Sequence, residues 1–362
     1  MQAAVQTAFD LAPDPAPAPS PAAGRLWLPD RVLFTPEALA LPWGERIHER
    51  VVALGLPVER LRSNRLVGLR GKSERETYRL AKRTLSVVTA PPGQLRLQPI
   101  PPSADWQFHL AQGCPAHCQY CYLAGSLQGP PTVRVYANLP EILANLAAYE
   151  QPGRTTTFEA SCYTDPLSLE HLTGSLAETI RYFGTRAGAQ LRWVTKFAAV
   201  EPLVGLAHHG RTRARFSVNA APVSRRWEGG TAPVAARLAA AATLARDGGY
   251  PIGLVVAPIV ALDDWQAHYA ALLDEAAAAL PEGCDLTFEL ITHRFTPGSR
   301  DVLAGWYPNS TLEMDPAARS EKRNKFGGVK YVYPRDTMRA LRGWFDAAIA
   351  ERFPRARVLY WT

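Results

Sequence analysis

The sequence predicts a parallel α/β fold in the form of a partial barrel, and two observations lead to this prediction. From residue 105, short apolar runs rich in Val, Ile, Phe, Thr or Trp alternate with longer amphipathic stretches, which is typical of buried parallel strands alternating with helices. The runs cover residues 106–110, 155–160, 191–197, 214–218, 252–259 and 286–291. No glycine fingerprint of a dinucleotide-binding unit follows the first run, which favours a partial barrel over a doubly wound sheet.

The segments on either side of the barrel are expected to be separate regions. Residues 1–24 are rich in Ala and Pro and contain little to bury, which predicts a disordered tail. Residues 25–100 are interpreted as a small N-terminal α/β region, with a strand over 26–34 and a capped helix start at 35–37. The barrel is then assigned to residues 101–300, and residues 301–362 to a C-terminal extension.

Helical patterns fill the spaces between the apolar runs. Ile142, Leu143, Leu146 and Tyr149 share one helical face, and a second such face extends over residues 169–183. The Ala-rich segment 235–245 is a strong helix former, and the glycine pair at 248–249 is a good C-terminal stop. In the extension, a helix is expected around 336–351 and a final strand over 357–361.

Composition and charge limit the class of protein. The chain has 362 residues, 47% of them hydrophobic and 20% charged, as in globular proteins. It contains no run of about 18 or more apolar residues and no apolar core of a signal peptide, so neither a membrane span nor export is expected. A cytoplasmic protein with reduced cysteines is therefore predicted. The net charge of +7 permits a polyanionic partner without requiring one.

One segment concentrates much of the positive charge. Between residues 60 and 83 only Glu74 and Glu76 oppose nine basic residues, which are Arg60, Arg62, Arg65, Arg70, Lys72, Arg75, Arg79, Lys82 and Arg83. Such a group could form a face that binds phosphates. It could equally be the solvated face of a helix, and the sequence leaves both interpretations open.

The most specific chemical signal is a cysteine triplet in the loop after the first barrel strand. Cys114, Cys118 and Cys121 are separated by three and two residues. A lone structural zinc ion needs four ligands, so three thiolates in one loop do not favour it. They fit a 4Fe–4S cluster in which one iron has no protein ligand. An open iron can bind and activate another molecule. The five cysteines are too unevenly spread for a disulfide framework.

Polar and reactive residues follow the ends of the predicted strands. In parallel barrels, ligands collect at the C-terminal ends of the strands. The sequence therefore predicts one pocket lined by the cysteine loop and by residues 162–165, 196, 217–219, 257–258 and 292–294. Cys284 lies outside this set and is interpreted as a packing residue.

A second basic segment lies in the C-terminal extension. It combines cations with aromatic residues around a glycine pair, namely Lys322, Arg323, Lys325, Phe326, Lys330 and Tyr331. Cations suit phosphates and aromatic rings suit bases, so this segment fits a nucleic-acid site. A surface hairpin is the other interpretation.

Several blocks, taken in order, resemble one known family. They are residues 113–123 (GCPAHCQYCYL), 158–162 (FEASC), 170–173, 194–197, 212–219, 230–233, 256–258 and 287–296. The cysteine loop resembles that of the radical S-adenosylmethionine (SAM) enzymes, and the later blocks resemble the spore photoproduct lyase family within that superfamily. The resemblance extends from about residue 26 to the C-terminus. It implies a partial (β/α)6 TIM-like barrel of the radical SAM type.

The resemblance also implies an activity, a DNA repair lyase. In this family SAM, bound at the open iron of the 4Fe–4S cluster, yields a 5′-deoxyadenosyl radical that takes a hydrogen from a methylene-bridged thymine dimer, and two thymines result. The partners implied are DNA with a thymine photolesion and a reducing protein such as a flavodoxin or a ferredoxin. One alternative is an enzyme of the same lineage acting on another lesion or base. Another is a non-catalytic iron–sulfur protein that binds nucleic acid or senses redox state.

Carried over residue by residue, the resemblance assigns roles around the cysteine loop. The cluster ligands are Cys114, Cys118 and Cys121. Cys162 returns the final hydrogen to the substrate; its alternative is a buried strand cysteine. Tyr120 and Tyr122 relay the radical, pack around the cluster, or do both.

Two further sets of contacts are expected, and the resemblance assigns the first of them. Those to SAM are Thr164, Lys196, Ser217 and Ala257. Those to the lesion or DNA are His293, Arg294, Lys325, Phe326, Lys330 and Tyr331. An ordinary salt bridge is the alternative for Lys196, and orientation of a neighbour is the alternative for His293.

This chain departs from the family pattern at two places. The family tends to have Ser at the position of Thr164, and this change keeps the hydroxyl. Many members have Arg-Tyr where this chain has Lys325-Phe326, which removes a bidentate fork and a hydroxyl. We expect lesion preference or rate to differ, and the cleavage chemistry to be retained.

Overall fold

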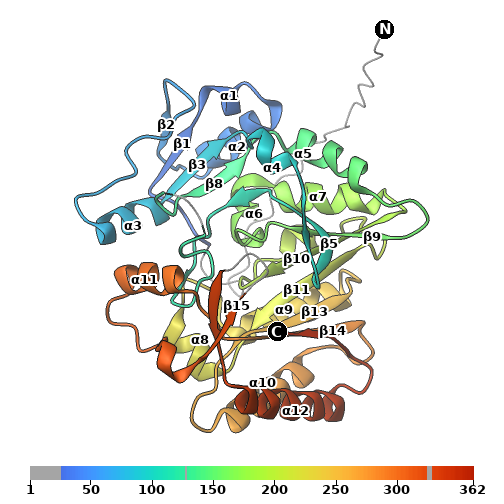
Figure 1. Cartoon of the computed structure of the whole chain (residues 1–362). Helices are drawn as coiled ribbons and strands as arrows, with labels where there is room; N and C mark the ends of the chain where they lie inside the picture. Colours follow the sequence, from blue (N-terminus) through green and yellow to red (C-terminus); the bar gives the residue numbers. More distant parts are fainter. Residues whose placement is uncertain (1–25, 127–128, 324–327) are drawn as a thin grey trace.

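The computed structural model describes residues 26–126, 129–323 and 328–362 (Figure 1). Two sheets organise these residues, a five-stranded one and an eight-stranded one. The tail expected over residues 1–24 lies outside the described residues. Across the described residues, no helix combines the length and the apolar character needed to cross a bilayer.

The five-stranded sheet has the strand order β2-β1-β3-β8-β6. Its strands are β1 (Arg31–Phe34), β2 (Val58–Arg60), β3 (Thr84–Val88), β6 (Ala111–Gln112) and β8 (Val133–Tyr136). The strand expected over 26–34 is thus confirmed only for its last residues. The expected helix start is confirmed, because the Thr35 side chain caps α1 (Pro36–Leu39). Since β6 and β8 lie beyond residue 100, this sheet draws on both sides of the division expected there, and that division stays a proposal.

The eight-stranded sheet has the strand order β17-β14-β13-β11-β10-β9-β5-β4 and forms the partial barrel. All neighbours run parallel except β4, which is antiparallel to β5. Each predicted apolar run corresponds to a strand, the final strand expected over 357–361 is confirmed as β17, and β4 is an additional strand at the other edge. The strands are β4 (Gln98–Ile100), β5 (Ala104–Phe108), β9 (Thr156–Ala160), β10 (Ala189–Thr195), β11 (Thr212–Val218), β13 (Ile252–Ile259), β14 (Leu286–Thr292) and β17 (Arg357–Trp361).

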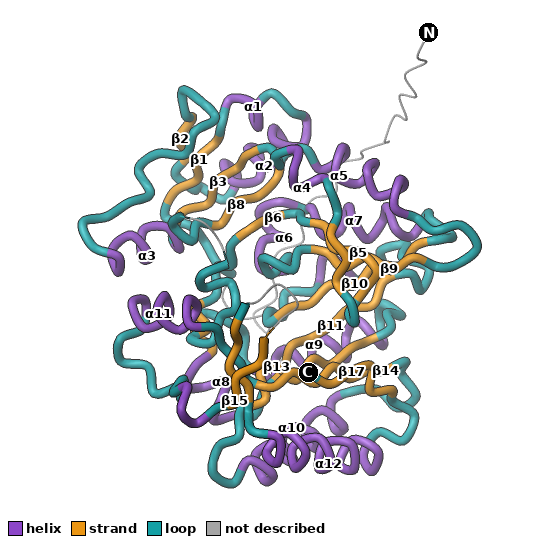
Figure 2. Tube along the Cα trace, viewed as in Figure 1, coloured by secondary structure: helices purple, strands orange, loops and turns teal. Residues whose placement is uncertain are grey.

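Helices cover the outer face of the barrel strands (Figure 2). The helices expected at 235–245 and around 336–351 are confirmed as α9 and α12. The helices other than α1 are α2 (Pro42–Ala53), α3 (Glu74–Lys82), α4 (Pro92–Leu95), α5 (Leu139–Leu146), α6 (Glu170–Thr173), α7 (Ser175–Gly184), α8 (Ala221–Trp227), α9 (Val234–Arg246), α10 (Trp265–Ala279), α11 (Pro297–Trp306) and α12 (Arg335–Arg352).

Several short strands and turns complete the fold. The strand β7 (His117–Cys118) lies in the cysteine loop and pairs antiparallel with β12 (Glu228–Gly229). The strands β15 (Ser320–Arg323) and β16 (Val329–Val332) form an antiparallel hairpin. Single 3-10 turns occur at Ala147–Tyr149, Leu167–Leu169, Glu201–Leu203 and Pro316–Ala318.

The main core lies between the barrel strands and the helices outside them. Phe158 of β9 packs against Phe183 of α7 with ring centroids 5.6 Å apart, and neither side chain is exposed. Burial of one such side chain stabilises the fold by roughly 1.5–3 kcal/mol. This packing fixes the strands in register, so the strand ends form a rigid base for the site.

Glu170 joins two of these helices through a buried carboxylate. It lies in α6, and its oxygens accept the backbone N–H groups of Leu176 (2.8 Å) and Ala177 (3.2 Å) in the first turn of α7. Burial raises the pKa of Glu170 to about 7, although these N–H groups oppose the shift.

A pH dependence of stability follows from this raised pKa. The folded protein keeps the Glu170 proton up to about pH 7, whereas the unfolded chain releases it near pH 4.5. The free energy of unfolding should therefore fall by up to roughly 3 kcal/mol as the pH rises through this window. In Glu170→Gln this component should be absent. Denaturant titrations at several pH values test this prediction. The same dependence of the free energy of unfolding on pH in both proteins would contradict the assignment.

Candidate active site

The cysteine loop is held in place by backbone contacts and by one buried lysine. Lys82, at the end of α3, donates to the carbonyl oxygens of Cys114 and Ala116. Gly113 has a φ of 79°, and a Cβ there would lie 2.3 Å from the carbonyl oxygen of Thr132, so only glycine fits. The Thr164 hydroxyl donates to the Gly113 carbonyl oxygen and ties the loop to the end of β9.

The three thiols of this loop form a compact donor set. All are free, and Cys118 is buried. Burial raises the pKa of Cys114 to about 12, whereas the Lys82 cation lowers it. Burial also raises the pKa of Cys118. The Lys196 cation lowers this pKa, and the charges of Cys121 and Cys114 raise it. The thiols therefore lie within electrostatic reach of one another and of two cations.

This donor set fits an iron–sulfur cluster by its chemistry. Soft thiolates are the usual ligands of such clusters, and Lys82 and Lys196 supply positive charge that favours the thiolate form. Within residues 26–126, 129–323 and 328–362, no three His, Cys, Asp or Glu side chains are arranged to hold a single metal ion.

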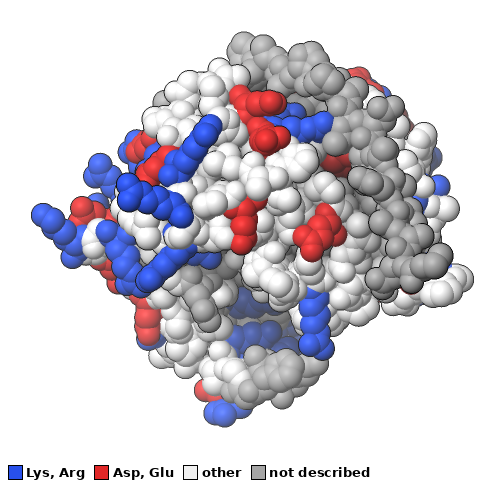
Figure 3. Space-filling model, turned by 90° about the horizontal axis from the view of Figure 1, so that it is seen from above, with Lys and Arg blue, Asp and Glu red and all other residues white. Residues whose placement is uncertain are grey.

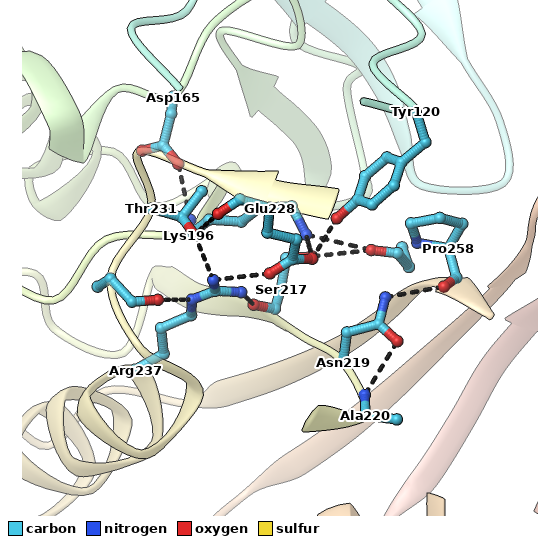
Figure 4. Close-up of polar contacts among 12 residues, drawn as sticks. Tyr120, Asp165, Lys196, Ser217, Asn219, Ala220, Glu228, Thr231, Arg237 and Pro258 are labelled. Atoms are coloured by element: carbon cyan, nitrogen blue, oxygen red, sulfur yellow. Dashed lines mark hydrogen bonds and ion pairs between the residues drawn. The ribbon is translucent and has the colours of Figure 1, made fainter. Parts of the chain in front are cut away.

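Three of the four residues expected to contact SAM meet at one point inside the barrel (Figure 4). Lys196 Nζ donates to Ser217 Oγ at 2.8 Å and to the Ala257 carbonyl oxygen at 3.1 Å. These residues come from the C-terminal ends of three neighbouring strands, β10, β11 and β13, as the barrel rule predicts. The fourth residue, Thr164, lies at the end of β9 beside the cysteine loop.

Glu228 is the counter-ion of Lys196 at this point, and no pattern in the sequence indicates it. Its Oε1 lies 2.8 Å from Lys196 Nζ and accepts the Tyr120 hydroxyl, and its Oε2 lies 2.7 Å from Arg237 Nη2 (Figure 4). Burial alone would raise the pKa of Glu228, but Lys196 and Arg237 outweigh it and lower this pKa to about 2. The Lys196 interaction predicted as an alternative, a salt bridge, is therefore present within the expected SAM pocket.

Cys162 lies just beyond β9, after a strained turn. Ser161 has a φ of 59°, and its backbone N–H and side-chain oxygen are bonded to Phe108 and Leu110 of the neighbouring strand region. Burial raises the pKa of the Cys162 thiol, and the negative charge of the nearby Glu159 carboxylate raises it further. Cys162 is therefore held as a neutral S–H group at neutral pH.

Glu159 belongs to a buried ionic network that the sequence also did not indicate. Arg215 Nη2 lies 2.6 Å from Glu159, and its Nη1 lies 2.7 Å from Glu289. Glu289 in turn accepts the Tyr360 hydroxyl at 2.5 Å and pairs with Arg192. The network crosses the barrel interior from β9 through β11 to β14 and β17. It fixes the Glu159 carboxylate, whose charge acts on the Cys162 thiol.

The two tyrosines of the cysteine loop take different positions. Tyr120 is directed inward, where its hydroxyl donates to Glu228 and Lys196 Nζ lies 5.5 Å from its ring centre. Tyr122 has 62% of its surface exposed. The Cys162 and Cys121 groups both lie close enough to act on the Tyr122 hydroxyl. Tyr122 thus lies near both Cys162 and Cys121, and the radical relay stays a prediction.

The residues expected to contact the lesion or DNA fall into distinct settings. His293 is buried, and its carbonyl oxygen and Nδ1 lie 3.2 and 3.3 Å from the guanidinium of Arg319, so it orients a neighbour. Arg294 is exposed. Tyr331 pairs with Phe295, their ring centres being 5.3 Å apart. Lys325 and Phe326 lie outside the described residues.

A basic group gathers on the β15–β16 hairpin. Lys322 and Lys330 are direct cross-strand partners, an arrangement that like charges normally oppose. Burial lowers the pKa of Lys330, and the cations of Arg294 and Lys322 lower it further. Figure 3 shows a hollow with Lys and Arg side chains in its depth. Concentrated positive charge of this kind favours an anionic ligand.

The basic segment 60–83 divides into two parts. Lys82 is buried and holds the cysteine loop, so it is not part of any surface. The other eight cations are exposed. They lie on the α3 side of the molecule, where Lys and Arg gather at the left edge of Figure 3.

Comparisons with known proteins place the chain in a family. The family model described as spore photoproduct lyase matches residues 27–362. The spore photoproduct lyase of Geobacillus sp. (strain Y412MC61) is 40% identical over 93% of this chain and 99% of its own length. That of Bacillus subtilis (strain 168) is 38% identical over 93% and 99%. A solved structure of a spore photoproduct lyase double mutant with bound AdoMet and dinucleoside spore photoproduct matches with a TM-score of 0.89 and 38% identity, over 93% of this chain and all of the other. The chain therefore belongs to the spore photoproduct lyase family.

Proposed function

We propose that this protein is a DNA repair lyase that converts the spore photoproduct, a methylene-bridged thymine dimer, into two thymines with a 4Fe–4S cluster and SAM. Its family relatives are named for this lesion, and a relative binds AdoMet together with the dinucleoside lesion. The observation that carries the proposal is the position of Cys162 just beyond β9, where the next two residues, Tyr163 and Thr164, bond Gly113 of the cysteine loop.

In the proposed reaction, the cofactors supply the radical chemistry and the protein side chains bind and position them. When bound, cluster and SAM supply a 5′-deoxyadenosyl radical that takes a hydrogen from the lesion. In the proposal, Cys114, Cys118 and Cys121 hold the cluster, while Lys196, Ser217 and the Ala257 carbonyl group bind SAM. Thr164 supports this site by fixing the loop at Gly113. Glu228 keeps Lys196 in place and neutralises its charge.

The final hydrogen return is assigned to Cys162. A hydrogen-atom donor must carry its hydrogen, so a thiol serves and a thiolate does not. The raised pKa of Cys162 keeps it in the useful form. Tyr122, near this thiol and exposed, and Tyr120, beside Lys196, are assigned to the return of the radical.

DNA binding is assigned to the hairpin side of the molecule. Arg294, Lys322 and Lys330 are close enough to influence one another's charge, and they fit the phosphates flanking a lesion. The lesion has to leave the base stack to reach the barrel interior. Lys325, Phe326 and Tyr331 complete this proposed contact set, His293 supporting it through Arg319. The reduced form of the cluster requires an electron donor, assigned to a small reducing protein such as a flavodoxin or a ferredoxin.

One anaerobic turnover experiment tests the function. The reconstituted protein is mixed with SAM, dithionite and a dinucleotide carrying the lesion, and both 5′-deoxyadenosine and repaired dinucleotide are measured. We expect both products. Formation of 5′-deoxyadenosine without repair would preserve the radical SAM assignment and reject this substrate.

The Lys325-Phe326 departure favours a second candidate, an enzyme of the same lineage acting on another nucleic-acid lesion. Incubation with irradiated DNA, followed by quantification of several photoproducts, separates the two candidates. Loss of the methylene-bridged dimer alone supports the first, and loss of a different photoproduct supports the second.

A further inference from the structure

A pocket on the outer side of the cysteine loop is not used by the proposed repair chemistry. It has a volume of about 590 Å³ and lies beside α3 and α11, which pack together on one side of the molecule (Figure 1). Arginines and aromatic residues line most of it, among them Arg75, Arg79, Arg83, Tyr78, His117 and Trp306.

The floor of this pocket is in direct contact with the cluster-binding loop. His117 lies between two of the three loop cysteines in the sequence, and its Nδ1 is 2.9 Å from the Tyr78 hydroxyl. Tyr78 also stacks on Trp306, their ring centres being 4.7 Å apart. Lys82, on the same helix as Tyr78, bonds the carbonyl oxygen of Cys114. A short chain of packed groups therefore leads from the pocket surface to Cys114 and Cys118.

The pocket and the proposed substrate site lie on different sides of the loop. Tyr120 is directed from the loop to Glu228 and Lys196 in the barrel interior, whereas His117 faces Tyr78 on α3. A molecule in the pocket could thus reach the loop while the barrel interior holds substrate.

The charge of the pocket rim selects an acidic partner. Arg75 and Arg79 are exposed and have no ion pair among the residues that the structure describes, whereas Arg83 is paired with Asp30. Glu76 is the one acidic side chain among the described residues that line the pocket, and its carboxylate accepts the backbone N–H of Lys72, so the rim keeps an excess of positive charge. An excess of guanidinium groups around an aromatic floor matches a protein surface rich in carboxylates.

We propose that the α3–α11 pocket, with Arg75 and Arg79 at its rim, docks an acidic one-electron carrier protein that reduces the cluster. This inference rests on the proposed function, because it requires a redox-active cluster at Cys114, Cys118 and Cys121. The carrier loses one electron and the cluster gains it, with no proton transferred. Electron transfer slows steeply with distance, so the carrier gains most by docking where the loop meets the surface.

A redox protein fits this position better than DNA does. DNA bound in the pocket would have its phosphates near Arg75 and Arg79, on the side of the loop away from Cys162 and Lys196. Such binding would not bring a lesion to the thiol that is assigned to repair it. DNA contact is therefore treated as the competing outcome of the test.

The test reverses the charge of the rim in the reconstituted full chain. The affinity of a purified flavodoxin for the double variant Arg75→Glu/Arg79→Glu is measured at low salt. We expect affinity to fall by roughly tenfold or more, since rim charges control such encounters. The rate of 5′-deoxyadenosine formation should fall similarly with flavodoxin, its reductase and NADPH, and should change less than about twofold with dithionite, which needs no docking.

The matched control is Arg339→Glu/Arg342→Glu on α12. These two arginines are exposed and lie on a different helix of the molecule. Two Arg→Glu changes there alter the net charge by the same amount as the rim variant does. Flavodoxin affinity and both rates should stay near those of the unaltered protein. An equal loss in this control would show a general charge effect and overturn the docking site.

Other outcomes also decide the question. Unchanged flavodoxin affinity in the rim variant overturns the proposal, as does a selective loss of affinity for lesion-containing DNA. If charge reversal lowers the bound iron content, Arg75→Gln/Arg79→Gln replaces it; weaker flavodoxin binding there supports the proposal and unchanged binding overturns it. If the unaltered protein forms no 5′-deoxyadenosine with dithionite, the proposed function fails, and this inference fails with it.

Discussion

Replacement of Glu228 by Gln is expected to lower the free energy of unfolding by about 3–5 kcal/mol, because it removes the buried carboxylate of an ion-pair cluster. The carboxylate lies 2.8 Å from Lys196 Nζ and 2.7 Å from Arg237 Nη2. Glutamine keeps the volume of the side chain but leaves both cations without a counter-charge. Chemical denaturation of the full chain measures the loss.

The control for this prediction is Glu321→Gln in the exposed pair with Arg323. Exposed pairs contribute about 0–1 kcal/mol, so this change should have little effect. A loss for Glu228→Gln no larger than that of the control would contradict the assigned role.

The pH dependence of the unaltered protein offers a second measure of Glu228. Its folded pKa of about 2 is below the ordinary value of 4.5, so the stabilisation is complete above pH 4.5. It is lost as the pH falls from about 4.5 to 2, and the Glu228→Gln protein should lack this component. The stabilisation by Glu228 is lost as the pH falls, whereas the contribution of Glu170, whose pKa is raised, is lost as the pH rises from 4.5 to 7.

Replacement of Cys162 by Ala is expected to change the fate of the substrate rather than the start of the reaction. SAM cleavage and opening of the methylene bridge should continue, because the proposed cluster and SAM contacts do not include this thiol. The two-thymine product should become a minor one, since the product radical has lost its hydrogen donor. Chromatography with mass spectrometry of the dinucleotide products measures the change.

Cys284→Ala is the matched control, because Cys284 is also a free cysteine and lies away from the barrel's strand-end pocket. It should leave the product distribution unchanged. A normal yield of repaired dinucleotide from Cys162→Ala would remove Cys162 from the mechanism.

Glu159 gives a direct test of how the Cys162 thiol is kept protonated. Burial is the first cause of its raised pKa, and the Glu159 carboxylate is the second. In Glu159→Gln the pKa of Cys162 should therefore fall while staying above the ordinary thiol value. The pH profile of iodoacetamide reaction at Cys162, read by peptide mass spectrometry, should move to lower pH. An unmoved profile would show that burial alone sets the pKa.

The barrel was predictable from the sequence because its strands have a local signature. Buried parallel strands are short and apolar, and the helices between them carry an apolar face at helical spacing. Those rules identified β5, β9, β10, β11, β13 and β14. They did not assign the partners of β8, which joins β3 across a gap of many residues. Partner choice depends on long-range packing, which has no local period.

The candidate site shows the same limit. The rule for strand ends selected Lys196, Ser217 and Ala257, which meet in the structure. No local pattern distinguished Glu228 or Glu159 from other acidic residues. Their importance depends on burial beside a particular cation, which follows from strand register and the placement of β12.

The sequence by itself determined the family, the barrel and the cysteine triplet, because these depend on residue types at fixed local spacings. Only the tertiary structure decided which charges are buried together. It placed Glu228 between Lys196 and Arg237. It placed Glu159 against Arg215 and near Cys162. It buried Lys82 under the cysteine loop and left the neighbouring arginines exposed. The physical reason is that the energy of a charge depends on its desolvation and its neighbours, and both arise only when distant segments pack.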